Sequence, residues 1–295
     1  ADNIVDLAFG RITCANSDEA NNIVSKIKDY ELNIEKGSWR NLITLISDDG
    51  YTSTGYEGSE HTAPSEVLST SYFPKSFDVK KIYSAAYPDV VTSQGRRKPE
   101  VNQAIIDAMN QGTLFVNYIG HGSPELWAHE VIFEKSVTLP QLNNNKYFFL
   151  CAATCDFGYF DIPNYQSAAE AIMFLPNSGA IAGFSASRLV YSGYNHQLNY
   201  KFVTNLFLTN RDTLNLGIPI GKAAFTTKRE LYDINDRKYL IFGDPTLRLK
   251  VPQYSAVIDS INNQNLSVDI QIRALSNNKI DGTILKPENI PWNDF

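Results

Sequence analysis

The sequence predicts an α/β fold in which a parallel sheet carries helices on both faces. Segments typical of strands and of helices alternate along most of the 295 residues. Three of the expected strands are short, almost continuously apolar runs, at 41–46, 113–119 and 146–152. Such runs suit parallel strands that are buried on both faces, and each of them leads into a loop of polar and small residues.

The first half of the chain supplies most of the expected sheet. We expect a strand at Val5–Thr13 and then a helix that begins at Ser17, its N-cap, and ends near Leu32. A polar loop follows the strand at 41–46. The next expected elements are a helix at Pro64–Tyr72, a strand at Val79–Tyr83 and a helix at Pro99–Asn110, whose proline suits a first helical position.

The second half continues the alternation and then changes character. After the strands at 113–119 and 146–152 we expect helices at 166–175, 195–208 and 220–231, and strands at 180–185 and 246–251. After Pro252, β-type residues stand among Asn and Ser at Val257–Ile272, and no helix pattern follows. The sequence therefore predicts an α/β domain at 1–252 and the beginning of an all-β module at 253–295.

Charge and composition exclude several classes of partner. The net charge is −6, and the one basic cluster, Gln94–Lys98, is expected to be a solvated loop, so no nucleic-acid partner is expected. No run of about 18 apolar residues is present, which argues against a helical membrane span. The three cysteines, Cys14, Cys151 and Cys155, are too few for a disulfide framework and lack the pairing of a zinc site.

Reactive groups of an open parallel sheet lie on the loops that leave the carboxyl ends of its strands. The three apolar strands here lead into Asp48 and Asp49, into His121 between two glycines, and into Cys155. An imidazole within hydrogen-bond reach converts a cysteine into a thiolate nucleophile. If the second and third strands are neighbours, their ends lie about 5 Å apart. His121 and Cys155 are therefore a candidate catalytic pair.

Other interpretations of these residues stay open on spacing alone. Gly-His-Gly also suits a tight turn, and a cysteine at a strand end is commonly a small buried apolar side chain. Cys151 lies inside its strand and is expected in the core. His61 is expected to be solvated in its loop, with a place in the lining of a cleft as the alternative. His129 is expected on the surface or at a cleft rim, and His196 is a weak candidate for function.

Four motifs, in this order along the chain, resemble those of the gingipain-type cysteine peptidases. The first is the segment 7–31, with Phe-Gly-Arg-Ile at 9–12, which is similar to the opening of the second half of their catalytic domain. Asn-Tyr-Ile-Gly-His-Gly-Ser-Pro-Glu-Leu-Trp at 117–127 resembles their histidine motif. Tyr-Phe-Phe-Leu at 147–150, leading into Ala-Thr-Cys-Asp-Phe-Gly at 153–158, resembles their cysteine motif. Phe-Gly-Asp-Pro-Thr-Leu at 242–247 resembles the turn near the end of that domain.

The resemblance implies a caspase-like α/β fold followed by an immunoglobulin-like module. It also implies a smaller amino-terminal half, which is not evident, so 1–252 is expected to be the peptidase domain without that half. His121 matches the catalytic histidine, and Cys155, not Cys151, matches the nucleophile. In some relatives an acidic residue orients the histidine; Asp48 and Asp49 stand where it would fall, and Asp48 is favoured.

Further residues of these motifs are candidates for the cleft. Backbone N–H groups near Gly122 and Cys155 are expected to stabilise an oxyanion, with Asp156 beside them. Glu125, Trp127 and Arg188 are expected to line the cleft, Trp127 as an aromatic platform for substrate. The competing interpretations are core packing for Trp127 and a surface salt bridge for Arg188.

Within the family, the likeness is greatest to the sortase-like surface peptidase of the type IX secretion system. The residues that carry it are 154–161, 187–192 and the β-module after Pro252. This implies a cysteine endopeptidase or transpeptidase that removes C-terminal sorting domains from secreted cargo and links the cargo to a surface anchor. It also implies protein or peptide substrates, outer-membrane proteins of the secretion system as partners, and an extracellular or cell-surface location.

Two other functions remain open beside the transpeptidase. A general secreted protease, and a catalytically silent surface module for binding or scaffolding, are the alternatives. Some relatives bind calcium, but no loop here has a dedicated ligand spacing. No metal or cofactor is therefore expected.

Overall fold

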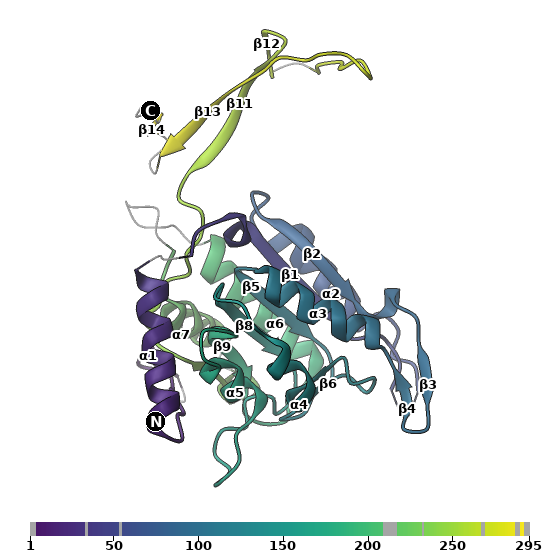
Figure 1. Ribbon diagram of the computed structural model, residues 1–295, viewed down its shortest axis with the longest axis vertical. Helices are drawn as coiled ribbons and strands as arrows, with labels where there is room; N and C mark the ends of the chain where they lie inside the picture. Colours follow the sequence, from purple (N-terminus) through teal and green to yellow (C-terminus); the bar gives the residue numbers. More distant parts are fainter. Residues whose placement is uncertain are drawn as a thin grey trace.

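A six-stranded sheet forms the centre of the computed structural model, which describes residues 4–32, 35–52, 55–208, 217–231, 233–266, 269–286 and 290–291 (Figure 1). In spatial order its strands are β10 (Tyr239–Phe242), β9 (Ala180–Ala186), β8 (Phe148–Ala153), β5 (Phe115–Ile119), β1 (Leu42–Ser47) and β2 (Asp78–Tyr83). Neighbouring strands from β9 to β2 pair in parallel, and β10 pairs antiparallel with β9. The predicted α/β fold is confirmed, with one antiparallel edge.

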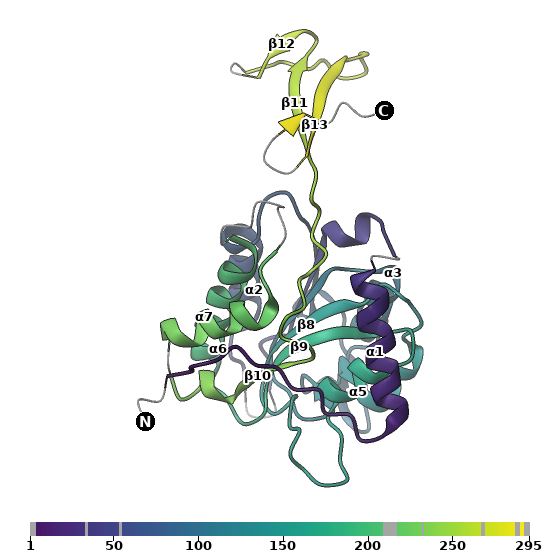
Figure 2. The ribbon, with the colours of Figure 1, turned by 90° about the vertical axis from the view of Figure 1, so that its left-hand side faces the viewer.

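Helices cover both faces of this sheet, as Figure 2 shows. One face carries α1 (Ser17–Glu31), α3 (Pro99–Gln111) and α5 (Ala168–Phe174). The other carries α2 (Thr62–Val67), α6 (Ser192–Val203) and α7 (Ile220–Leu231). The π-helical turns Leu68–Tyr72 and Thr204–Leu208 extend α2 and α6. Among the described residues, no helix combines the length and the apolar character that crossing a membrane requires.

The strands are apolar throughout because each of their two faces packs against a layer of helices. In β8, Phe149 and Cys151 belong to the core on the α6 face, while Phe148 and Leu150 belong to the core on the α3 face. This alternation follows the two-residue period of a strand. The α/β scaffold thus holds the carboxyl ends of β1, β5 and β8 at one edge, where the candidate residues lie.

Helix ends follow the capping signals closely. Pro99 is the first residue of α3, as predicted. The N-cap of α1 is Asn16 rather than Ser17, because the Asn16 side chain accepts a 2.9 Å hydrogen bond from the Glu19 N–H. Both residue types cap helices well, so the sequence left the position uncertain by one residue.

Two predicted strands are wrong. Val5–Thr13 forms no strand; only Arg11 bridges the edge strand β10, and Leu7 is 76% exposed. The predicted strand at 246–251 is absent because Asp244 caps a turn there, accepting hydrogen bonds from both the N–H and the hydroxyl of Thr246. The strand lies earlier, at β10, which the sequence analysis missed.

Short elements connect the sheet to its helices. They are the hairpin of β3 (Val90–Thr92) and β4 (Gly95–Arg97), the pair β6 (Leu126–Trp127) and β7 (Phe133–Glu134), α4 (Lys135–Thr138), and 3₁₀ turns at Ser38–Asn41, Ser84–Ala86, Leu139–Gln141 and Asp236–Lys238. The hairpin corrects the prediction that Gln94–Lys98 is a solvated loop, because Lys98 is 4% exposed and Arg96 is half-buried among carboxylates.

A buried amine fastens α1 to the sheet. Lys26 is fully buried, and its Nζ donates hydrogen bonds to the carbonyl oxygens of Met173 (2.8 Å), Ser178 (2.5 Å) and Ala180 (2.8 Å). These carbonyls belong to the end of α5, the turn after it and the start of β9. Burial lowers the pKa of Lys26 well below its usual value. The amine therefore satisfies three backbone acceptors that the helix end would otherwise leave buried.

The residues after Pro252 form a separate antiparallel sheet of four short strands. They are β11 (Ser255–Ile261), β12 (Gln264–Asn265), β13 (Ile280–Lys286) and β14 (Ile290–Pro291), in the order β12-β11-β13-β14. Figure 1 shows this sheet extending away from the α/β domain. The predicted module at 253–295 is therefore all-β where it is described; residues 267–268, 287–289 and 292–295 lie outside the description. Its immunoglobulin-like character stays a prediction.

Candidate active site

A cleft of about 400 Å³ opens at the carboxyl ends of β5 and β8. Its lining residues are Glu57, Glu60, His61, Ile119, Gly120, His121, Ala153, Cys155, Val190, Tyr191, Ser192, Asn195 and His196. Both residues of the predicted catalytic pair are among them. The cleft therefore holds the candidate catalytic groups.

The strand register explains why His121 and Cys155 meet at this cleft. β5 and β8 are adjacent parallel strands, and Ile119 pairs with Ala153, an offset of 153 − 119 = 34 residues. His121 and Cys155 have the same offset, 155 − 121 = 34, and each stands two residues beyond its paired strand end. Neighbouring strands lie about 4.8 Å apart. The sheet thus delivers the imidazole and the thiol to equivalent positions on adjacent strand ends.

The backbone of His121 is held on both sides. Its N–H donates to Asp48 Oδ2 at 3.1 Å, and its carbonyl accepts from the Tyr118 hydroxyl at 2.6 Å and from the Ala128 N–H at 2.9 Å. Gly120 is required here, because a Cβ would stand 2.3 Å from the Tyr118 hydroxyl and 2.5 Å from the Asp48 Cβ. The loop therefore presents the imidazole from a fixed backbone.

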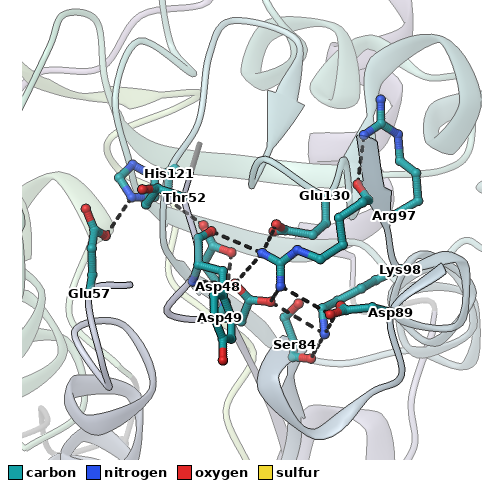
Figure 3. Close-up of polar contacts among 12 residues, drawn as sticks. Asp48, Asp49, Thr52, Glu57, Ser84, Asp89, Arg97, Lys98, His121 and Glu130 are labelled. Carbon is teal, nitrogen blue, oxygen red and sulfur yellow. Dashed lines mark hydrogen bonds and ion pairs between the residues drawn. The ribbon is translucent and has the colours of Figure 1, made fainter. Parts of the chain in front are cut away.

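Glu57 is the carboxylate that contacts the His121 ring. Its Oε2 lies 2.9 Å from His121 Nε2, and this hydrogen bond lowers the pKa of the Glu57 carboxyl. Asp48, favoured from the sequence, accepts a hydrogen bond from the backbone N–H of His121 instead of from its ring. Asp49 forms ion pairs with Arg96 and Lys98. Neither aspartate is hydrogen-bonded to the imidazole, and Glu57 occupies the place predicted for them (Figure 3).

Glu57 was not predicted from the sequence because it lies ten residues beyond the end of β1. The intervening loop folds back on itself: Tyr51 and Tyr56 form a β-bridge, and the Glu57 N–H donates to the Gly50 carbonyl at 2.6 Å. A return of this kind depends on loop conformation rather than on a periodic pattern. The rings of Tyr51 and Tyr56 pack across this return, with centroids 4.7 Å apart.

Asp49 belongs to a buried charge network, drawn in Figure 3, and Asp48 lies beside it. Arg96 donates to both oxygens of Asp49, at 3.0 and 3.3 Å, and also pairs with Glu130. Lys98 pairs with Asp89 at 2.9 Å. Burial raises the pKa of Asp48 to about 8. The network thus ties the β3–β4 hairpin to Asp49 after β1, while Asp48 holds the His121 backbone.

Cys155 is half-buried and rests on the loop after β9. Its S–H donates to the Val190 carbonyl at 3.4 Å, and the Val190 N–H lies 3.5 Å from its sulfur. Burial raises the pKa of the Cys155 thiol. Cys151 is buried in the core as predicted, and burial raises its pKa strongly. Of these two cysteines, Cys155 is the one that lines the cleft.

His61 and His196 also line the cleft, which for His61 was the alternative to a solvated position. His61, expected to be solvated, is 3% exposed and immediately precedes α2. Burial and the neighbouring His121 lower its pKa to about 4, so its ring is neutral at pH 7. His196, a weak candidate for function, is half-buried on α6, and burial lowers its pKa. His129 is exposed, as predicted, with its ring centroid 5.0 Å from that of His121.

Trp127 is not a substrate platform. It is fully buried, stacks on Tyr118 with centroids 4.3 Å apart, and lies 4.5 Å from Phe133. Tryptophan at the end of a motif loop suggested exposure, but the β6–β7 pair turns the ring inward. The packing interpretation is therefore correct.

The remaining cleft candidates lie around the cleft rather than along its described lining. Glu125 is exposed and hydrogen-bonded to Tyr165, and Arg188 forms a surface ion pair with Asp161 at 2.6 Å. Asp156 has a left-handed φ of 54°, and its N–H donates to the Arg188 carbonyl. Gly122 lies close to Thr154, where a Cβ would stand 2.4 Å from the hydroxyl. Gly122 and Asp156 therefore flank the pair.

One group of these side chains has the composition of a metal site. Single ligand atoms of Asp48, His61 and His121 all lie within 4.8 Å of one another. Asp48, Asp49 and Glu130 form a second such group, but Arg96 and Lys98 already provide cations for it.

Comparison with known proteins identifies the family. The family model described as Peptidase family C25 matches residues 1–250. The solved complex of the pro- and mature domains of RgpB from Porphyromonas gingivalis is 20% identical, with a TM-score of 0.65, and the match covers 87% of this chain and 60% of that one. The comparison with curated proteins gives no match.

Two further solved structures share the fold. The structure titled as the Arg specific cysteine proteinase gingipain R is 20% identical with a TM-score of 0.63, and the match covers 86% of this chain and 60% of that one. A structure described simply as a protease is 15% identical with a TM-score of 0.63, covering 99% and 69%. This chain thus spans about 60% of the length of the first two. The family model covers most of the sequence, so the chain belongs to peptidase family C25, the gingipain family of cysteine peptidases.

Proposed function

We propose that the chain is a cysteine peptidase in which Cys155 is the nucleophile and His121 the general base. The observation that carries the proposal is the shared register of these residues on adjacent strands that open into one cleft. Cysteine and histidine so placed form the minimal unit of nucleophilic acyl transfer. The proposed chemistry uses a thiol and an imidazole and needs no resident metal or cofactor.

The steps follow from these groups. His121 accepts the proton from the Cys155 thiol, and the thiolate attacks the scissile carbonyl. Backbone N–H groups at Gly122 and Cys155 are the proposed donors to the oxyanion, where a donor is commonly worth about 3–4 kcal/mol. His121 then gives its proton to the leaving amine, which leaves a thioester on Cys155. Water or a second amine attacks the thioester and releases the acyl group.

Glu57 is the proposed positioning residue for the imidazole, in place of Asp48 or Asp49. Its hydrogen bond to Nε2 orients the ring so that the other nitrogen faces away from the carboxylate. A carboxylate in this position also stabilises the imidazolium that forms when the thiol is deprotonated.

Glu57→Gln is expected to lower kcat/KM about 100-fold, because a misoriented base costs roughly that factor. KM is expected to change little, since Glu57 acts through His121. The matched control is Glu60→Gln, which alters a second glutamate of the cleft. Glu60 accepts a 2.6 Å hydrogen bond from the Ser192 hydroxyl and has no hydrogen bond to His121. Steady-state kinetics on both variants measure this. Equal losses in the two variants would show that charge in the cleft, rather than orientation of His121, is what matters.

We further propose that the physiological reaction is sortase-like transpeptidation at the cell surface. In this proposal the enzyme removes C-terminal sorting domains from secreted cargo and joins the cargo to a surface anchor, beside outer-membrane proteins of the secretion system. The likeness of residues 154–161 and 187–192 to that branch of the family supports it. The cleft also has room beside Cys155, along Tyr191 and Ser192, for an incoming amine.

An acceptor assay tests this function. The chain is incubated with a library of peptides, with and without a primary amine such as hydroxylamine, and products are identified by mass spectrometry. We expect the peptide–amine adduct to exceed the hydrolysis product when the amine is in the millimolar range. Hydrolysis alone at all amine concentrations indicates instead a general secreted protease.

The second candidate is a catalytically silent binding or scaffold module on the surface. The observation in its favour is the environment of Cys155. Its thiol donates a hydrogen bond to the Val190 carbonyl, and burial raises its pKa, so the thiolate is disfavoured. If no library peptide is cleaved or joined to an amine by the unmutated chain, the silent module becomes the better function.

A further inference from the structure

Three side chains of metal-ligating types, two of them from the lining of the cleft, come together from three separate parts of the chain. Asp48 follows β1, His61 stands at the start of α2, and His121 follows β5. One ligand atom of each lies within 4.8 Å of the other two. The His61 and His121 rings meet edge-on, with centroids 5.0 Å apart. The fold thus concentrates two imidazoles and a carboxylate in one place.

His61 is the unusual member of this group. Its side chain is 4% exposed, and neither ring nitrogen has a hydrogen-bond partner among the described residues. Leaving a buried polar atom without a hydrogen bond is destabilising. The proposed peptidase mechanism gives His61 no role. A buried imidazole without a hydrogen-bond partner, with a ligand atom within 4.8 Å of one on a second imidazole, suits a transition-metal ion.

Two carboxylates, those of Asp48 and Glu57, lie next to the two imidazole rings. The two Asp48 oxygens accept hydrogen bonds from the N–H groups of Asp49 (2.8 Å) and His121 (3.1 Å), which fixes the carboxylate in place. Glu57 Oε2 lies 2.9 Å from His121 Nε2 and 3.7 Å from His61 Nε2. Histidines that bind zinc usually have a carboxylate next to the ring, which orients it.

We propose that this cleft binds one Zn²⁺ ion through His61, His121 and Asp48, and that the ion holds the enzyme inactive. Two imidazole nitrogens and one carboxylate are a common three-ligand zinc set with an open fourth position. Calcium and magnesium prefer oxygen ligands and suit this set poorly. Ligand atoms around tetrahedral zinc lie about 3.3 Å apart, so the rings close in by at most about 1.5 Å.

Binding and inhibition use the same atoms. Zinc accepts lone pairs from both imidazoles and from the Asp48 carboxylate, whose proton passes to solvent. The His121 lone pair is then no longer free to accept the Cys155 proton. The zinc site stands independently of the proposed peptidase activity; only its inhibitory effect rests on that function.

Calorimetric titration with zinc chloride tests the site in the Cys155→Ala chain, which keeps the three ligands and requires no turnover. We expect one zinc per chain, at least tenfold weaker binding when His61→Gln is added, and an unchanged constant when His196→Gln is added instead. Calcium chloride is expected to give no heat of binding. Absence of saturable zinc binding, or equal binding in the His61 and His196 variants, overturns the assignment.

A second measurement needs no change at the ligands. Zinc is expected to protect His121 from carbethoxylation at least fivefold, as read by mass spectrometry, while the exposed His129 reacts as before. This keeps the proposal testable if His61→Gln does not fold. If zinc leaves the reaction of His121 unchanged, the ion lies elsewhere and the proposal is wrong.

Inhibition is measured separately on the active chain. Zinc is expected to abolish peptide cleavage reversibly, with full recovery on chelation, and His61→Gln is expected to raise the half-inhibitory concentration at least tenfold. Zinc binding without any peptide cleavage in the absence of zinc would refute the proposed function and leave the metal site intact. Cleavage that persists on the zinc-saturated chain would refute the inhibitory role.

Discussion

Cys155→Ala is expected to lower kcat/KM for peptide cleavage by about 10⁴-fold or more, because the acyl intermediate forms on that sulfur. His121→Ala is expected to cause a loss of similar size, since the thiol is not deprotonated without the imidazole. The double variant is expected to be no worse than either single one, because nucleophile and base act as a unit. Initial rates on a cleavable peptide measure all three.

Cys151→Ala is the matched control. Cys151 lies four residues earlier, inside β8, and is buried in the core, so its replacement by alanine is expected to leave most activity. Labelling with iodoacetamide gives a second readout: Cys155 is expected to react much faster than Cys151, whose burial raises its pKa and blocks access. An inactive Cys151→Ala beside an active Cys155→Ala would reverse the assignment of the nucleophile.

Trp127→Ala is expected to lower the free energy of unfolding by about 3–5 kcal/mol, the usual cost of removing a buried large aromatic. Trp127 is fully buried against Tyr118 and Phe133, directly behind the His121 loop. The cavity is therefore expected to weaken the packing that supports the loop. Urea unfolding followed by circular dichroism measures the loss.

The control for Trp127→Ala is Tyr194→Ala, which truncates an aromatic that is 48% exposed on α6. Surface truncations usually change stability by less than about 0.5 kcal/mol. If Trp127→Ala instead left stability unchanged and raised KM for peptide, the ring would be a substrate platform after all.

Much of the sheet was predictable because apolar strands carry their own signal. The runs at 41–46, 113–119 and 146–152 became β1, β5 and β8 almost residue for residue, since burial on both faces demands continuous apolar sequence. β10 is four residues long and pairs antiparallel at the edge, so neither its length nor its direction followed from the alternation of strands and helices.

The residues of the site were likewise predictable where they follow a strand directly and not where a loop places them. His121 and Cys155 follow strands directly, so strand order and register were enough to bring them together. Glu57 and His61 reach the cleft through a loop and the start of a short helix, and their positions depend on the path of that loop. A carboxylate next to a strand end, such as Asp48, was the natural choice for the partner of His121. It bonds the backbone instead because the Glu57 loop folds over the imidazole.

The fully enclosed Lys26 has a consequence for how opening of this domain can be followed. An acylating reagent meets the amine only after α1 has separated from α5 and β9, because three carbonyls surround it in the closed state. The lysines at the surface, such as Lys279, are modified at once. Mass spectra taken over a time course give the rates at which Lys26 and the surface lysines are acylated. The lower rate at Lys26 reports how often α1 separates from the sheet.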